Sequence, residues 1–140
     1  MKLLILALCA AAVCAGPAWN IIAEQEVYLI KTSWEHVKFH EVDLLYFIFK
    51  EHPAVQAKFP KFVGKDLESI KGTPDMAVHS TRIISFFSQY ILLLGKESSQ
   101  PCIKMILNDM GIVHRYRGIT KELFTDFRAS TFNYLKTHFP

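Results

Sequence analysis

Apolar residues recur at spacings of three and four along most of this chain, which is the periodicity of α-helices. One such stripe runs from Glu24 to about Lys38. Residues 42–49 form a dense apolar block that, taken alone, could be a buried strand. Charged residues and Pro53 flank the block without a hairpin signal, so we predict a helix there. Pro53 then opens a short helical turn through Lys58.

The second half of the chain continues the same pattern. Residues 59–73 contain turn residues and predict a loop or a short helix, and Pro74 starts a long helix that stops at Gly95. Residues 98–101 predict a fresh helix start with a capping serine and an early proline. Gly118 ends that helix, and Thr120 is a plausible cap for a last one. We therefore predict an all-α fold with a single domain.

The N-terminus has a different character. Lys2 precedes a short apolar run, and small residues end at Ala15. This is the pattern of a secretory signal peptide, so we expect residues 1–15 to be removed and residues 16–140 to form an extracellular domain. The run is too short to span a bilayer, which takes about 20 residues, and we expect no membrane partner.

Composition narrows the function classes. The 140 residues are 51% hydrophobic and 21% charged, which excludes a disordered chain. A net charge of +3, from 16 basic and 13 acidic residues, is too small and too evenly spread to predict nucleic-acid binding. The eleven phenylalanines indicate a large core or a flat apolar ligand. Outside the signal, Cys102 remains alone, and a free thiol is favoured over an intermolecular bridge.

Two histidines occupy positions where leucines would be expected. His79 and His114 lie in line with the apolar stripes of consecutive predicted helices, whereas the other four histidines have polar or terminal neighbours. One such histidine is most often a hydrogen-bonded core residue. A pair favours a ligand-binding role, because buried imidazoles need partners and neutral imidazole binds metals well.

Two imidazoles are a poor set of ligands for structural zinc, which takes four. No Cys, Asp or Glu falls in register with both stripes, and the C-x-x-C-H signature of covalent haem is absent. What remains is iron in a planar macrocycle, which supplies four ligands itself. Spacing alone leaves haem and a satisfied core pair both open.

Longer segments carry a specific resemblance. They are His52-Pro53, residues 58–72, residues 79–87, residues 114–120 and residues 127–129. In these segments the chain resembles a globin, and more narrowly the extracellular haemoglobins of midge larvae. The similarity runs from about Glu24 to Phe139. The resemblance implies a globin-like helical fold around a pocket for haem b.

The resemblance also implies roles for site residues. His114 corresponds to the proximal iron ligand, with its other N–H oriented by a backbone carbonyl or a hydroxyl. His79 corresponds to the distal residue, whose N–H would stabilise bound dioxygen. Phe59 would wedge against the porphyrin face, and Ile83 would cap the ligand pocket. Arg82 would pair with a haem propionate, swing towards the ligand, or remain a solvated surface charge.

We therefore expect reversible dioxygen binding, for transport or storage in an extracellular fluid such as haemolymph, and no enzymatic turnover. Nothing adds a catalytic acid–base pair beside His79. Two alternatives stay open: a haem-free secreted helical carrier or interaction protein, and a truncated globin without function.

One feature departs from the family pattern. Globins carry a further long helix after the one ending near His138, and here the sequence stops at Pro140. The resemblance therefore implies a domain short by one helix. We expect that the last apolar residues cannot all be buried, namely Phe124, Phe127, Phe132 and Leu135. The lost burial, on the order of 10 kcal/mol at about 25 cal/mol/Å², predicts marginal stability, ready haem loss, or a partner such as another globin chain.

Overall fold

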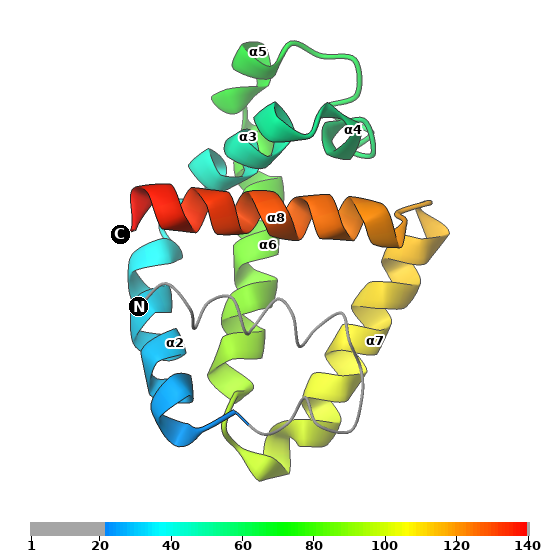
Figure 1. Cartoon of the computed structure of the whole chain (residues 1–140). Coiled ribbons are helices and arrows are strands. Elements are labelled where there is room, and N and C mark those ends of the chain that lie inside the picture. The colour runs from blue at the N-terminus through cyan, green and yellow to red at the C-terminus, as the bar shows by residue number, and fades with distance from the viewer. Residues whose placement is uncertain (1–21, 140) are drawn as a thin grey trace.

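The computed structural model describes residues 22–139, and every regular element within them is a helix (Figure 1). The predicted signal peptide lies outside these residues. In chain order the helices are α2 (Glu24–Val37), α3 (Glu41–Glu51), α4 (Pro53–Gln56), α5 (Leu67–Lys71), α6 (Pro74–Leu93), the 3₁₀ turn η1 (Glu97–Ser99), α7 (Gln100–Tyr116) and α8 (Lys121–His138). The predicted all-α fold is confirmed.

Local chemistry explains where the long helices start and stop. The Thr73 hydroxyl accepts a hydrogen bond from the Met76 N–H at 3.3 Å, which caps the start of α6. Gly95 follows α6 with a φ of +79°, a backbone conformation that favours glycine. At the start of α8, Thr120 accepts a hydrogen bond from the Leu123 N–H at 3.4 Å, as predicted.

The predicted serine cap of α7 is wrong. Ser99 occupies the N-cap position, but its side chain makes no capping hydrogen bond. The 3₁₀ turn η1 leads directly into α7, and Ser99 is in the helical region of backbone space. A serine in that conformation does not adopt the extended geometry with which N-cap side chains usually reach the first turn. The early proline, Pro101, does lie in the first turn of α7.

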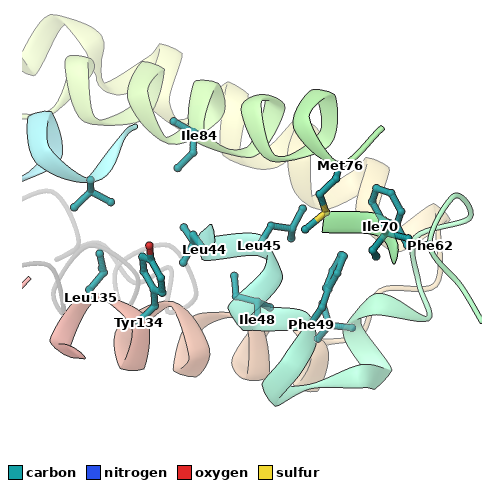
Figure 2. Close-up of a cluster of buried hydrophobic side chains, with 12 residues drawn as sticks. Leu44, Leu45, Ile48, Phe49, Phe62, Ile70, Met76, Ile84, Tyr134 and Leu135 are labelled. Carbon is teal, nitrogen blue, oxygen red and sulfur yellow. The ribbon is translucent and has the colours of Figure 1, made fainter. Parts of the chain in front are cut away.

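The main core lies where α3 packs between α6 and α8. Figure 2 shows Leu44, Leu45, Ile48 and Phe49 of α3 between side chains of these two helices. Ile48 is completely buried. These contacts fix α6, and therefore the histidine that it carries, against the rest of the molecule.

A second core joins α2 to the C-terminal end of α6 and the N-terminal end of α7. Its buried members are Val27, Ile30, Tyr90, Ile91, Leu94 and Ile103. No residue of α7 from Met110 onward belongs to either core. The two cores thus leave the last turns of α7 outside the main packing of residues 22–139.

The helices α6 and α7 therefore meet at one end only. In Figure 1 they join through η1 at the lower edge and diverge towards α8, which runs across them. No helix within residues 22–139 is long and apolar enough to cross a membrane.

Candidate functional site

His114 lies in the last turns of α7 with one ring nitrogen already engaged. Its Nδ1 lies 2.8 Å from the backbone oxygen of Met110, one turn earlier. A carbonyl oxygen only accepts hydrogen bonds, so Nδ1 must carry the proton and Nε2 must carry the lone pair. The ring is half-buried and its centroid lies 5.3 Å from that of Phe124 in α8. In the neutral ring, Nε2 is therefore left without a proton and is available to a ligand.

His79 lies in the second turn of α6 with a half-buried ring. Its centroid lies 4.6 Å from that of Phe59, in an edge-to-face arrangement, and 6.1 Å from that of Phe62. These rings come from the segment between α4 and α5. They hold the imidazole in an apolar setting on one side of α6.

Burial is the main cause that lowers the pKa of His79 below its usual 6.5. The positive charges of Arg82 and Arg117 lower this pKa further. The imidazole is therefore neutral at neutral pH and offers one N–H donor. A neutral donor suits a ligand that gains partial negative charge when it binds.

An electrostatic effect links the two histidines. Beside the two arginines, His114 also lowers the pKa of His79, as the smallest of the four causes. The ring contacts of both histidines are apolar: Phe59 and Phe62 contact His79, and Phe124 contacts His114. Each of the two helices therefore carries one imidazole that packs against phenylalanine rings.

The other predicted site residues take different positions. Phe59 contacts His79 directly, as given above. Ile83 is half-buried one turn after His79 and, with Phe127 and Leu44, lines a small apolar crevice between α3, α6 and α8. Arg82 is exposed, and no carboxylate within residues 22–139 forms an ion pair with it.

Sequence reasoning missed Arg117 and left the backbone partner of His114 unspecified. Arg117 follows His114 by three positions, at the C-cap of α7, and its charge acts on His79. Arg82 also follows its histidine, His79, by three positions. This shared spacing could have identified Arg117 from the sequence. The Met110 carbonyl was expected only as an unspecified backbone or hydroxyl acceptor, because a backbone partner has no sequence signature.

The ligands fit haem better than a bare metal ion. Among residues 22–139, no three His, Cys, Asp or Glu side chains come together in a group that could hold a metal. His114 has one hydrogen-bonded ring nitrogen, and its ring neighbour Phe124 is apolar. One imidazole ligand and an apolar lining suit an iron whose four other ligands come from a flat ring.

One prediction about burial is confirmed at α8. Leu135 is buried, whereas Phe124, Phe127 and Phe132 are half-buried. The last apolar residues are therefore not all covered, as expected from the sequence.

Comparison with known proteins identifies one family. The profile of the globin family matches residues 42–140. Globin CTT-VI of Chironomus thummi thummi is 45% identical over 138 residues, covering 99% of this chain and 83% of the relative. Globin CTT-X of the same midge is 48% identical over 122 residues, covering 87% of this chain and 81% of the relative.

Solved structures give the same result. A haemoglobin component of Tokunagayusurika akamusi superposes with a TM-score of 0.83 at 41% identity, covering 88% of this chain and 82% of that one. A globin of Drosophila melanogaster superposes with a TM-score of 0.75 at 27% identity, covering 83% and 78%. With the family profile, the fold and these relatives in agreement, this chain belongs to the globin family, whose cofactor is haem b.

Proposed function

We propose that this protein holds haem through His114 and binds dioxygen reversibly on the side of His79. The observation that carries the proposal is the hydrogen bond from His114 Nδ1 to the Met110 carbonyl, which leaves Nε2 free. Haem supplies, when bound, a ferrous iron that accepts dioxygen. The side chains of this protein hold the haem, donate a hydrogen bond to the ligand and exclude water.

His79 acts through its neutral N–H. Burial and the neighbouring positive charges favour the uncharged ring, so the ring donates one hydrogen bond without carrying a net charge. The edge contact with Phe59 restricts its orientation. His79 therefore slows the loss of the ligand rather than taking part in a reaction.

Phe59 and Ile83 exclude water from the ligand side. Both side chains are apolar and half-buried next to His79. Water and protons promote haem oxidation, so a dry site favours binding over oxidation. No acid–base pair accompanies His79 among its ring contacts, which are both phenylalanines. We therefore propose a carrier or store of dioxygen and not an enzyme.

Arg82 acts at the edge of the site. Its exposed guanidinium lies near enough to lower the pKa of His79. We propose that it pairs with a carboxylate at the haem periphery, where a charge-assisted hydrogen bond is strongest. Export from the cell through the signal peptide of residues 1–15, and a folded domain from residue 16, are part of the same proposal. A second globin chain as partner stays a prediction.

A haem titration tests the role of His114. We expect wild-type protein to develop a sharp Soret band at one haem per chain, and His114→Ala to lose stable haem attachment, with affinity lowered at least about 100-fold. His138→Ala is the matched control, because His138 Nδ1 makes the same type of backbone bond, 2.9 Å to Tyr134 O, on α8. Equal haem affinity of His114→Ala and the control would refute the assignment.

A further inference from the structure

The segment between α4 and α5 is held together by one buried amide. Gln56, the last residue of α4, is only 9% exposed. Its Nε2 donates hydrogen bonds to the backbone oxygens of Phe62 and Lys65, each at 2.9 Å. Its own backbone oxygen accepts the Phe59 N–H at 3.0 Å. Gln56 thus contacts the beginning, middle and end of this segment.

Both N–H groups of the amide are used, so the side chain closes the loop in two places. Gly64, at a φ of +72°, lets the chain turn between the two accepting carbonyls. Without the amide, the buried Phe62 carbonyl would keep only the weaker bond from the Lys65 N–H at 3.2 Å, and the Lys65 carbonyl would lose its side-chain donor. An apolar residue at position 56 would therefore favour a more open loop.

The closed loop presents two rings to the site. Phe59 and Phe62 pack on Phe49 of α3, with ring centroids 4.9 Å and 5.8 Å away. The same two rings contact His79, as described above. Lys61 also ties the loop to α6 through an ion pair with Asp75 at 2.6 Å. Both charged groups are exposed, and exposed pairs contribute little. The buried amide is the stronger constraint.

We propose that Gln56 is a positioning residue for the ligand site: its amide fixes the loop, the loop fixes the Phe59 ring, and that ring fixes the imidazole of His79. The link to oxygen binding rests on the proposed function, whereas the link from Gln56 to the loop does not. The two parts are tested separately.

The first test uses hydrogen exchange with and without added haem. Gln56→Met keeps the side-chain length and removes both donors. Ser88→Ala is the control, because it removes the hydrogen bond between Trp34 Nε1 and Ser88 Oγ, 2.9 Å long, which joins α2 to α6. We expect the amides of Phe62, Val63 and Lys65 to exchange at least about fivefold faster in Gln56→Met and to be unchanged in the control.

The second test measures oxygen dissociation from the ferrous protein by stopped flow. Gln56→Met should release oxygen about three- to tenfold faster than Ser88→Ala, because a less constrained imidazole donates a weaker hydrogen bond. The Soret absorption of both variants should match that of wild type, which shows that haem attachment is intact. A merely structural role would not move this rate relative to the control.

Unchanged loop exchange in Gln56→Met would overturn the inference, and so would faster exchange with a release rate equal to the control. If Gln56→Met does not fold, wild-type protein still decides: the side-chain N–H groups of Gln56 should exchange at least about tenfold slower than those of exposed Gln25. Equal exchange of the two side chains would also overturn it. Failure of wild type to bind oxygen would refute the proposed function while leaving the exchange test valid.

Discussion

The two site histidines differ in how their protons are held. His114 has its Nδ1 proton fixed by the Met110 carbonyl, so its tautomer is set by the backbone of its own helix. His79 is held by ring contacts instead, and its protonation is governed by burial and by nearby positive charges. These two environments fit the proposed roles, a metal ligand for His114 and a neutral donor for His79.

Replacing His79 tests the donor role. His79→Leu should retain haem but release oxygen about 10- to 100-fold faster and oxidise faster, because the hydrogen bond to the ligand, about 1.5–3 kcal/mol, is lost. His79→Gln is the matched control, since its amide keeps an N–H donor and should retain part of the effect. Stopped-flow release and the rate of conversion to the ferric spectrum check both. A slower release from His79→Leu would contradict the assignment.

The lowered pKa of His79 predicts how stability depends on pH. The unfolded chain binds a proton at this residue near the usual 6.5, whereas the folded chain binds it only at lower pH. This contribution to stability is therefore present above about pH 6.5 and decreases as the pH falls through that value. Wild type should lose more unfolding free energy than His79→Gln between pH 7 and 5, as measured by urea unfolding. Equal losses would show that the ring does not resist protonation.

At the level of single residues, the sequence predicted those side chains whose role follows from helical periodicity or from the globin resemblance. His79, His114 and Phe59 are of this kind, and their mutual placement fits the expected roles, which stay proposals. The sequence did not predict a role for Gln56. Its amide holds two loop carbonyls that only the tertiary structure brings together. Polar residues of this kind have no periodic signal.

The helices position the site by meeting at one end and separating at the other. The second core fixes α6 to the start of α7, while Met110 and His114 stay outside both cores. The separated ends carry the two histidines. Few buried contacts therefore support the last turns of α7, and we expect bound haem to stabilise them.

The cap of α8 gives a prediction at this scale. Thr120→Ala removes the hydroxyl that accepts the Leu123 N–H and should lower the free energy of unfolding by about 1 kcal/mol. Thr125→Ala is the matched control in the interior of the same helix, where its hydroxyl bonds the Lys121 carbonyl. It should change stability by less than about 0.5 kcal/mol. Chemical denaturation compares the two, and an equal loss would show that Thr120 is not a cap.

Helix positions were predictable because apolar stripes, prolines and glycines act locally. Pro74 and Gly95 bracket α6 as predicted, and residues 42–49 lie in a helix rather than a strand. The Ser99 cap failed because the 3₁₀ turn before it set the backbone angle, which a local pattern does not reveal. The short α5 could be predicted only as an option within a loop.

In the whole molecule, two hydrophobic cores support the helices that carry the two histidines. The main core holds α6 against α3 and α8, and the second holds α7 to α6. Neither the divergence of the two helices nor the half-buried phenylalanines of α8 follows from periodicity alone. Both depend on how the helices cross, which could be predicted only from the globin resemblance.

Reversible oxygen binding is visible in the absorption spectrum of the reduced, haem-loaded protein. We predict a five-coordinate deoxy spectrum under argon, the two visible bands of an oxygenated globin in air, and return to the deoxy spectrum when oxygen is removed. Rapid conversion in air to a ferric spectrum that argon does not reverse, or the absence of a Soret band after haem addition, would contradict reversible oxygen binding by this chain.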